Sequence, residues 1–558
     1  MATTAPDAEA APPPTSAEWA VLAAICAVAL LLRLWNVQQL HAHDPFFARP
    51  SLDERMYHEW AQAIAAGDGW GDQVFLNGPL YPYLLAGLYA LLGPSLLAAK
   101  VAHALLGTLT CVLTWWVGRR LFGPAVALGG AALVAVSRIL IFYDSTLVVD
   151  ALIVPLALLA VGAVRVAADR PSAGRWLAAG AAVGLGALAR PNALLLGALC
   201  GAWAWWALRE RAATARLRWL AAYALGALLW VAPVAGRNYA VSGGDFVPIT
   251  YSGGMNLFLG NNPDANGSFG VPRIFPRSTA DDPWEQREMF QRFAEQVEGR
   301  PLRPSEVSRF WSAQALRFAR EYPAQWAGLL CRKLELATNA FEPWNIRSIT
   351  ITREFSAVLR LPLVGFGLLA PLAVVGLALT AARWRELVPL YALLATVLAT
   401  LLVFFVLARY RLPAVPVLAL FASAGVADGV RRVRDRSPRA VGAALAAAAL
   451  AAFWVHREVA RDDLSIAYYN LGNRYKELAD WPRAIESYRR VLEARPSYVS
   501  AHNNLALVFE ATGEHDADAR IAWEHVRALA AAQGLPRYAE RAERHLRALD
   551  AFGAEPAP

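Results

Sequence analysis

Apolar stretches of membrane-spanning character alternate with polar segments along most of the 558-residue chain. Because a helix needs about 20 predominantly apolar residues to cross the hydrocarbon core of a bilayer, each stretch predicts one transmembrane helix. About eleven such helices are expected, at residues 19–36, 99–117, 124–142, 145–164, 175–189, 191–208, 218–235, 357–381, 386–407, 412–429 and 439–455. The pattern predicts an all-α, polytopic membrane domain over residues 19–455.

Two longer polar segments interrupt the apolar pattern. The first, 37–98, has helical composition from Asp53 to Ala66, followed by a short apolar helix over 80–92 that is suited to lie at the membrane interface. The second, 236–356, opens with turns rich in Gly, Asn and Asp and continues as an amphipathic helical pattern around 306–340. We expect 37–98 to form an outer loop and 236–356 to form a folded outer subdomain.

Charge and composition narrow the class of protein and give an orientation. Hydrophobic residues make up 57% of the chain and charged residues only 18%, which is typical of an integral membrane protein. The net charge of +8 comes largely from arginines in short loops between spans, so nucleic acid is not an expected partner. These arginines are Arg119, Arg120, Arg165, Arg170, Arg175, the run from Arg209 to Arg218, Arg383, Arg385 and the run from Arg431 to Arg439. The positive-inside rule makes their face cytoplasmic and places 37–98 and 236–356 outside.

The two ends of the chain differ from the apolar body. Residues 1–18 carry Asp7, Glu9 and Glu18 but no Lys or Arg, so they alone would not hold this end in the cytoplasm, and the later loops outweigh them. They also lack the basic start and cleavage site of a signal peptide, so we expect a disordered cytoplasmic tail before a retained first span. Residues 552–558 are expected to be a second disordered tail. The four cysteines, Cys26, Cys111, Cys200 and Cys331, imply no disulfide framework.

An internal repeat occupies the polar C-terminal region, 456–551. The segment beginning at Ala467 recurs at Ala501, a spacing of 34 residues that is the period of the tetratricopeptide repeat. The first copy has a Leu, a small residue and an aromatic at the positions that this repeat requires, and the second copy departs from the pattern at Asp518. We expect an α-solenoid outside the membrane that a helix near 537–549 caps, and that binds an acceptor protein or another partner in its groove.

Four arginines lie on the expected outer face, against the general charge pattern. Arg190 lies between the fifth and sixth spans, Arg237 follows the seventh, and Arg409 and Arg411 lie between the ninth and tenth. Guanidinium groups bind phosphate oxygens in bidentate fashion and stay charged, so these residues are candidates for binding the phosphate of a lipid-linked substrate. The alternative is that each side chain extends from a helix end towards the headgroups.

Two adjacent carboxylates, Asp53 and Glu54, begin the helical part of the outer loop. Successive residues on a helix point about 100° apart, so only one of them faces a given reacting atom. One carboxylate opposite a phosphate leaving group suits a general base that takes the proton from an acceptor hydroxyl. The alternative is helix capping, with Asp53 as the cap and Glu54 stabilised by the helix dipole.

Several motifs together resemble a known family, the membrane glycosyltransferases of the C-type fold, in the branch of bacterial protein mannosyltransferases and aminoarabinose transferases. The motifs run through residues 19–455 and comprise Leu52-Asp53-Glu54 to Tyr57, Trp60 to Asp68, Gly78-Pro79-Leu80-Tyr81-Pro82-Tyr83, Gly186 to Pro191, Arg237-Asn238-Tyr239, Gly254 to Pro263 and Arg409-Tyr410-Arg411-Leu412-Pro413. The resemblance implies a polyprenyl-phosphate sugar donor in the outer leaflet, inversion at the anomeric carbon, a bacterial inner membrane and Asp53 as catalytic base.

The same resemblance implies further site residues. Glu54 would support Asp53, and a substrate pocket would include Tyr57, Pro79, Tyr81 and Tyr83, with the segment from Pro79 to Tyr83 lining the entrance for the lipid. Tyr143 and Asp144 match the position of a second polar contact. Asp150 lies deeper and is equally interpreted as a buried hydrogen-bonding group.

No cofactor is expected. His41, His43 and Asp44 lie near Asp53, and some relatives use a divalent ion, but a His-x-His in a loop without a second matched pair is a weak metal signal. No Walker or Rossmann glycine pattern is present, which agrees with a donor that is an activated lipid.

The predicted function is transfer of a hexose or pentose from a polyprenyl phosphate to a hydroxyl of a protein, lipid or glycan on the periplasmic side. The alternatives are a transporter or flippase, although the related halves and broken helices of a transporter are not evident, and a non-catalytic membrane scaffold for the repeats.

Overall fold

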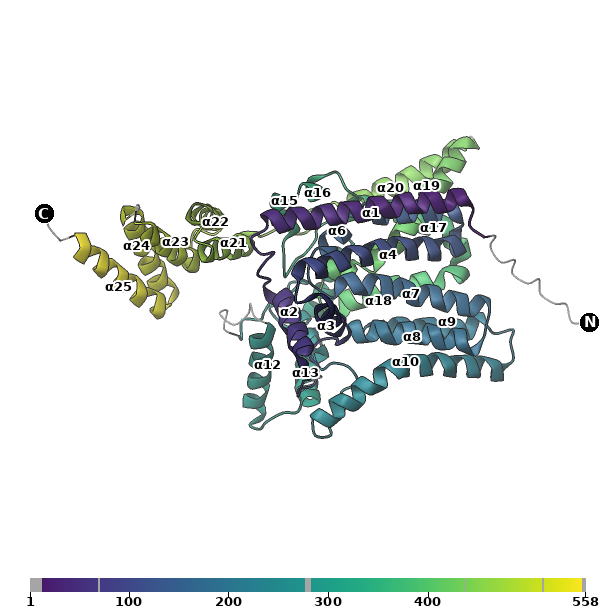
Figure 1. Cartoon of the computed structure of the whole chain (residues 1–558), viewed down its shortest axis with the longest axis horizontal. Coiled ribbons are helices and arrows are strands. Elements are labelled where there is room, and N and C mark those ends of the chain that lie inside the picture. Colours follow the sequence, from purple (N-terminus) through teal and green to yellow (C-terminus); the bar gives the residue numbers. More distant parts are fainter. Residues whose placement is uncertain (1–12, 69–70, 276–282, 436, 514–515, 554–558) are drawn as a thin grey trace, which may run out of the picture. The chain divides into compact units, whose positions relative to one another are not determined.

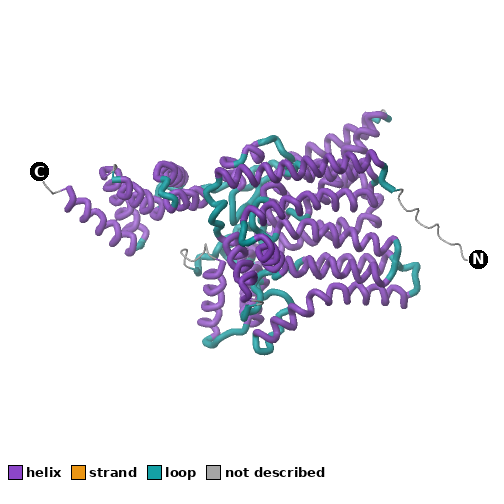
Figure 2. Tube along the Cα trace, viewed as in Figure 1, coloured by secondary structure: helices purple, strands orange, loops and turns teal. Residues whose placement is uncertain are grey.

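The computed structural model describes residues 13–68, 71–275, 283–435, 437–513 and 516–553, and their regular structure is helical apart from two isolated β-bridges (Figure 2). The described chain forms two compact units. The membrane unit comprises residues 1–41, 50–346 and 356–460, and the repeat unit comprises 42–49, 347–355 and 461–558. The predicted disordered tails fall largely outside the described residues, although the first helix already begins at Ser16.

The first half of the membrane unit consists of ten α-helices and one π-helical turn among the described residues. These are α1 (Ser16–His43), α2 (Leu52–Ala63), η1 (Ile64–Asp68), α3 (Leu80–Leu92), α4 (Leu96–Phe122), α5 (Pro124–Ala135), α6 (Arg138–Asp144), α7 (Asp150–Asp169), α8 (Ala173–Ala189), α9 (Ala193–Ala207) and α10 (Ala213–Val241). Figure 1 shows α1, α4, α7, α8 and α10 running alongside one another. The predicted short helix over 80–92 coincides with α3.

The second half adds the outer helices and the last membrane helices. They are α11 (Gly253–Gly260), α12 (Pro283–Glu298), α13 (Pro304–Glu321), α14 (Pro323–Thr338), α16 (Ala357–Arg360), α17 (Phe366–Thr380), η3 (Ala381–Arg383), α18 (Trp384–Val403), η4 (Ala408–Arg411), α19 (Ala414–Arg434) and α20 (Pro438–Val455). The helical pattern expected around 306–340 is two helices, α13 and α14.

The protein is a multi-pass membrane protein, and the expected number of spans is confirmed in part. Among the described residues, seven helical stretches are long and apolar enough to cross a membrane: 16–43, 96–122, 150–169, 213–241, 366–403, 414–434 and 438–455. Four shorter apolar helices, α3, α5, α8 and α9, accompany them. The span expected at 124–142 is divided between α5 and α6, because the main chain at 136–138 leaves the helix and bonds to Val364.

Small residues bring the membrane helices into close contact. A Cβ atom on Gly180 of α8 would lie 1.8 Å from the carbonyl oxygen of Tyr223 on α10, and one on Gly226 of α10 would lie 2.1 Å from that of Leu177. Helices in lipid associate through such close backbone packing, because apolar burial between them gains little. The α8–α10 pair therefore fixes the end of α8, where Arg190 follows.

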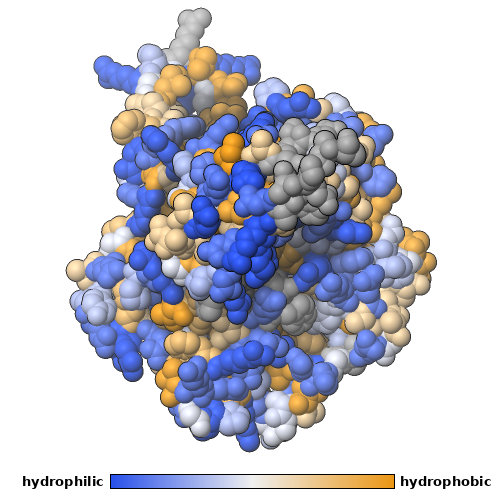
Figure 3. Space-filling view, turned by 90° about the vertical axis from the view of Figure 1, so that its left-hand side faces the viewer, coloured by the Kyte–Doolittle hydropathy of each residue, from blue (hydrophilic) through white to orange (hydrophobic). Residues whose placement is uncertain are grey.

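The outer helices have an aromatic core of their own. Trp311 of α13 contacts the rings of Phe258, Phe275 and Phe290. Phe405 and Leu407 belong to the same buried cluster and immediately precede η4. The outer core thus anchors the turn that carries Arg409. Hydrophilic residues predominate on the face of the molecule shown in Figure 3.

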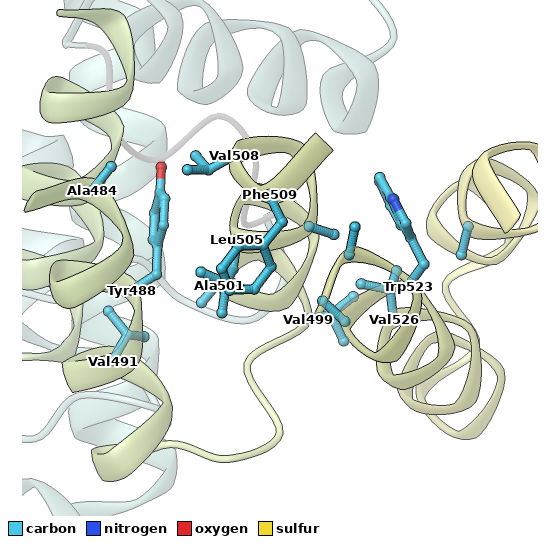
Figure 4. Packing of buried hydrophobic residues seen from close by; sticks show 14 of the residues in the cluster. Ala484, Tyr488, Val491, Val499, Ala501, Leu505, Val508, Phe509, Trp523 and Val526 are labelled. Atoms are coloured by element: carbon cyan, nitrogen blue, oxygen red, sulfur yellow. The ribbon is translucent and has the colours of Figure 1, made fainter. Parts of the chain in front are cut away.

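The repeat unit contains α21 (Ser465–Glu477), α22 (Trp481–Ala494), α23 (Val499–Thr512), α24 (Asp516–Gln533) and α25 (Pro536–Gly553). Figure 4 shows side chains of α22, α23 and α24 packed into one apolar core that includes Tyr488 and Trp523. A Cβ atom on Gly472 would lie 2.7 Å from the Tyr488 ring, which explains the small residue at this repeat position. The first helices of the two hairpins, α21 and α23, begin 34 residues apart, at Ser465 and Val499, as the repeat spacing predicts.

Two segments from distant parts of the sequence complete the repeat unit. They are residues 42–49 and 347–355, which include α15 (Ile349–Phe355). Asp44 forms an ion pair with Arg347, and the Arg474 Nε donates to the carbonyl oxygen of Pro45 at 2.8 Å. Tyr468 donates to the Glu354 carboxylate at 2.8 Å. The unit is therefore larger than the region that the repeat pattern predicted.

Candidate functional site

Asp53 lies in the first turn of α2 and points away from the helix cap. Ser51 holds the cap position, and its side chain makes no capping bond. Leu52 follows with a φ of 53°, a left-handed conformation that non-glycine residues adopt rarely and that is enriched at functional sites. The Asp53 Oδ2 instead accepts a hydrogen bond from the Arg409 Nη1 at 2.8 Å. The capping alternative therefore does not describe Asp53.

Four side chains form a chain of alternating charge at this point, which we call the ionic network. It consists of Asp53, Arg409, Asp150 and Arg190. The Arg409 Nη1 lies 2.8 Å from Asp53 and 4.0 Å from the Asp150 Oδ2, and the Arg190 Nη2 lies 2.9 Å from the Asp150 Oδ1. Asp150 begins α7 and Arg190 follows the last residue of α8, so four distant segments meet here. The structure thus brings together Asp53 and two of the four predicted arginines.

The ionic network is buried but not fully satisfied. The Asp150 side chain is 1% exposed and that of Arg409 is 9% exposed, whereas Asp53 retains 26%. The Asp150 Oδ2 and the Arg409 Nε are buried without a hydrogen-bond partner among the described residues. Burial alone would lower the pKa of the Arg409 guanidinium, but neighbouring Tyr410 and Asp53 hold that pKa well above its usual range. Arg409 therefore stays charged and keeps hydrogen-bonding capacity beside the exposed carboxylate.

Two cavities share one lining residue, Tyr410, which follows Arg409. The polar cavity, of about 140 Å³, is lined by residues that include Asp53, Asn77, Asn256, Arg287 and Arg409. The apolar cavity, of about 40 Å³, lies among membrane helices, where Leu156, Val183, Leu196 and Val397 line it together with Arg190. Tyr410 lines both, and its ring lies 4.6 Å from the Arg190 guanidinium. Apolar side chains therefore lie on one side of Tyr410 and polar groups on the other.

Glu54 occupies a different environment from Asp53. Its side chain is buried, at 1% exposure, and its Oε1 accepts from the backbone N–H of Leu147 at 3.2 Å. This bond ties α2 to the turn that precedes α7. Glu54 thus holds the elements that carry Asp53 and Asp150 and does not face the polar cavity.

The tyrosines predicted for the substrate pocket, Tyr57, Tyr81 and Tyr83, pack against other aromatic rings. The rings of Tyr57 and Tyr81 make an edge contact at 4.9 Å, and Tyr83 makes one with Phe75 at 6.3 Å. Burial, with Asp53 nearby, raises the pKa of the Tyr57 hydroxyl, so it stays protonated. Pro79 is buried at the start of α3.

The Tyr81 hydroxyl lies 3.0 Å from the Nε2 of His103, a residue that the sequence did not single out. Because the Nδ1 of this ring lies 3.0 Å from the Thr146 carbonyl oxygen, which can only accept, Nδ1 carries the proton and Nε2 accepts from Tyr81. This bond chain joins α3 to α4 and to the turn before α7.

Tyr143 and Asp144, which were both predicted to line the substrate pocket, have different surroundings in the structure. Asp144 pairs with the buried Arg33 of α1 at 2.7 Å, and a Cβ atom on Gly107 would lie 2.1 Å from its Oδ2. This ion pair joins helices and is not part of the ionic network. Tyr143 is buried, and its hydroxyl is within electrostatic reach of Arg409 and Asp150.

Arg237 and Arg411 each donate hydrogen bonds to two main-chain carbonyls. Arg237 donates to the carbonyl oxygens of Gln73 at 2.6 Å and Gly71 at 3.0 Å. Arg411 donates to those of Asn339 at 2.6 Å and Phe341 at 2.9 Å. Each thereby braces a loop beside the polar cavity, and we call these two residues the bracing arginines.

The residues considered as metal ligands do not gather into a site. Among the described residues, no three His, Cys, Asp or Glu side chains are grouped as metal ligands would be. Asp44 is engaged by Arg347 and by the backbone N–H of Phe46. The sequence alone assigned no role to Tyr410, Asn77 or Arg287. Of these, Tyr410 could have been selected from its position between two arginines.

Comparison with known proteins bears on two stretches of the chain. Residues 77–236 match the family model described as dolichyl-phosphate-mannose-protein mannosyltransferase, and residues 472–513 match a tetratricopeptide repeat. The resemblance to membrane glycosyltransferases with a repeat tail is therefore confirmed. A search of curated proteins finds no match.

Solved structures of membrane glycosyltransferases resemble the chain at low identity. The archaeal oligosaccharyltransferase AglB from Archaeoglobus fulgidus, in complex with an inhibitory peptide and a dolichol-phosphate, is 16% identical with a TM-score of 0.40, over 84% of this chain. The chain spans only 59% of the length of that enzyme. ArnT from Cupriavidus metallidurans, bound to undecaprenyl phosphate, is 17% identical with a TM-score of 0.36, over 75% of this chain and 79% of its own.

Proposed function

We propose that this chain transfers one sugar from a polyprenyl-phosphate donor to an acceptor hydroxyl on the extracytoplasmic face. The glycosyltransferase family that the chain matches uses sugars linked to polyprenyl phosphates. Asp53 acts as the general base, and the anomeric carbon inverts. One observation carries the proposal: Asp53 shares an ion pair with Arg409 at the wall of a polar cavity, and Tyr410 lines both that cavity and an apolar one.

The two cavities bind different parts of the donor. The first part of the polyprenyl chain packs along the apolar side chains of α7, α8, α9 and α18 that line the apolar cavity. The phosphate lies near Tyr410, within reach of Arg190 and Arg409, whose guanidinium groups offer hydrogen bonds to its oxygens. The sugar then enters the polar cavity, next to Asp53.

Donor binding and the release of Asp53 are linked in this geometry. In the ionic network, Arg409 is bonded to Asp53 and is 4.0 Å from Asp150. A phosphate competes with Asp53 for Arg409, while Asp150 remains as the buried counter-charge. The Asp53 carboxylate is thereby freed to accept a proton.

The transfer is a single displacement. The acceptor oxygen forms a bond to the anomeric carbon as the bond from that carbon to the phosphate oxygen breaks. The acceptor proton goes to Asp53, and the bonding electrons go to the departing polyprenyl phosphate. Arg409 and Arg190 stabilise the charge that develops on this leaving group. Glu54 keeps α2 in position through Leu147.

The orientation and the domain roles are part of the proposal. The Arg119 side chain, in a predicted cytoplasmic loop, lies 2.7 Å from Glu18, which supports placing the N-terminal end of α1 on the same side. The ionic network includes Asp150 at the start of α7 and Arg190 after the end of α8, and we place these helix ends on the periplasmic side of a bacterial inner membrane. Residues 19–455 would form the transferase domain, and 456–551 the repeat domain that binds an acceptor protein or an assembly partner.

The direct test is donor cleavage by the full chain in lipid nanodiscs. With polyprenyl-phosphate mannose as donor, the wild type releases polyprenyl phosphate when acceptors extracted from envelope material are added, and Asp53→Asn does not. Asp428→Asn is the matched control, because Asp428 also pairs with arginines but lies near the end of α19. Wild-type release by a folded Asp53→Asn protein would contradict the role of Asp53 as the base, and absence of release by the wild type would support a transporter or a scaffold.

A further inference from the structure

A second pocket opens beside the polar cavity and is lined by α2, the loop 71–77 and α12. This outer pocket, of about 210 Å³, is lined by residues that include Trp60, Asp72, Gln73, Asn77 and Arg287. It shares Leu76, Asn77 and Arg287 with the polar cavity. Because Asp53 lines the polar cavity, these shared residues lie between it and a molecule in the outer pocket.

The wall of the outer pocket is held in place before any ligand binds. Arg237 fixes the carbonyl groups of Gly71 and Gln73, and its guanidinium lies 4.1 Å from the Phe75 ring. The backbone N–H of Tyr251 donates to the Phe75 carbonyl at 3.3 Å. A Cβ atom on Gly78 would lie 2.3 Å from the carbonyl oxygen of Ala189, so the loop packs directly on the end of α8. Such preorganisation lowers the ordering cost of binding.

The outer pocket combines one aromatic face with several kinds of polar group. Trp60 is half-buried and lies 5.8 Å from Phe75. Asp72 supplies a carboxylate, Gln73 supplies an amide and Arg287 supplies a guanidinium. A sugar ring presents an apolar face of C–H groups and an edge of hydroxyls that both donate and accept, which matches this set.

An extended peptide matches the outer pocket less well. Peptide recognition usually uses a sheet edge, a hydrophobic groove for a helix, or an aromatic groove for proline-rich segments. The described wall consists of two helices and a loop, and the carbonyl groups of Gly71 and Gln73 are already bonded to Arg237.

We propose that the outer pocket is the acceptor subsite of this enzyme and that the acceptor is a saccharide. This inference rests on the proposed function and adds the chemical class of the acceptor. A sugar ring lies against Trp60, its hydroxyls bond to Asp72, Gln73 and Arg287, and the neighbouring hydroxyl passes Asn77 to reach Asp53.

The test uses the full chain in nanodiscs with polyprenyl-phosphate mannose and measures released polyprenyl phosphate. Two acceptor pools are compared, namely delipidated oligosaccharides from bacterial envelopes and peptides rich in Ser and Thr. We expect the oligosaccharides to stimulate release, with a mass increase of one hexose on the stimulating fraction. Trp60→Ala should raise the oligosaccharide KM about tenfold and change kcat less than about threefold, because a stacking contact in the ground state is also present in the transition state.

Control variants separate this role from a loss of folding. Trp60→Phe keeps an aromatic face and should recover most of the affinity, and Trp205→Ala on α9 should have the wild-type KM. If Trp60→Ala does not fold, Asp72→Asn, at an exposed residue, replaces it in the KM measurement. The donor KM should be unchanged in each variant.

The inference is overturned if peptides stimulate and oligosaccharides do not, if neither does, or if the folded Trp60 and Asp72 variants keep the wild-type KM. Asp53→Asn distinguishes the two levels. If peptides but not oligosaccharides stimulate release by the wild type, and that variant loses this release, only the saccharide acceptor is rejected. Full release in that variant rejects the proposed function itself.

Discussion

The arginines of the ionic network and the bracing arginines carry the same charge but have different kinds of partner. Arg190 and Arg409 face carboxylates, which can exchange places with a phosphate. Arg237 and Arg411 satisfy main-chain carbonyls, which would lose their partners if the guanidinium moved. The comparison teaches that the partner of an arginine, more than its position at the membrane boundary, indicates whether it can bind a substrate.

The largest expected effect distinguishes Asp53 from its neighbour. Asp53→Asn should lower the rate of transfer by about 100-fold or more, because an amide cannot accept the acceptor proton. Glu54→Gln should lower it by less than about threefold, since the amide oxygen still accepts from Leu147. Rates of polyprenyl phosphate release measure both. Equal losses in the two variants would show that the carboxylates act as a pair, contrary to the comparison.

The next effect separates the two kinds of arginine directly. Arg409→Gln should lower kcat/KM for the donor by about 100-fold, because the developing phosphate charge loses its principal partner. Arg411→Gln should change kcat/KM by less than about threefold but lower the stability by about 2–4 kcal/mol, because two buried carbonyls lose their donors. Donor kinetics and thermal unfolding in the same nanodiscs test this. A large rise of the donor KM in Arg411→Gln would place that residue in the phosphate site.

Arg237 should show a smaller effect on a different substrate. Arg237→Gln releases the loop 71–75, so the acceptor KM should rise by about three- to tenfold while the donor KM stays constant. Titration of each substrate at saturating concentrations of the other separates the two constants. A selective rise of the donor KM would instead support a direct contact of Arg237 with phosphate.

The smallest effect concerns a buried lysine that also binds a main-chain carbonyl, Lys333. Its Nζ donates to Asn261 at 3.0 Å and to the carbonyl oxygen of Leu402 at 2.9 Å. Burial lowers the pKa of this amine to about 8. In the unfolded chain a lysine titrates near about 10.4, so between these two values the unfolded state binds more protons and stability rises with pH.

The stability contributed by the lowered pKa is fully present above the unfolded value and is lost as the pH falls through about 8. Between about pH 7.5 and pH 9.5 the melting temperature of the wild type should therefore rise by a few degrees relative to that of Lys333→Met. Thermal unfolding at both pH values measures this difference. A constant difference would show that the amine is not titrating in this range.

The sequence predicted the parts of the site that local pattern determines. The apolar run 80–92 became α3, and the 34-residue spacing became two helical hairpins. Arg190 and Arg409 could be selected because charge at the outer boundary of a span needs a local partner. The sequence could not show which carboxylates these arginines bind, because Asp150 and Asp53 belong to other segments of the chain.

Other features depend on contacts between distant residues and had no local signal. The division of 124–142 into α5 and α6 follows from main-chain bonds to Val364. The roles of Arg237 and Arg411 follow from loops at 71–73 and 339–341. The inclusion of 42–49 and 347–355 in the repeat unit likewise depends on Asp44, Arg347 and Pro45, which no repeat pattern marks.

The central claim is that Asp53 and a donor phosphate compete for Arg409. Equilibrium binding of a fluorescent polyprenyl phosphate to the full chain in nanodiscs tests it most directly. Asp53→Asn should bind the lipid about three- to tenfold more tightly than the wild type, because the guanidinium is released, whereas Arg409→Gln should bind it about tenfold or more weakly. Weaker binding by Asp53→Asn, or unchanged binding by Arg409→Gln, would contradict the account.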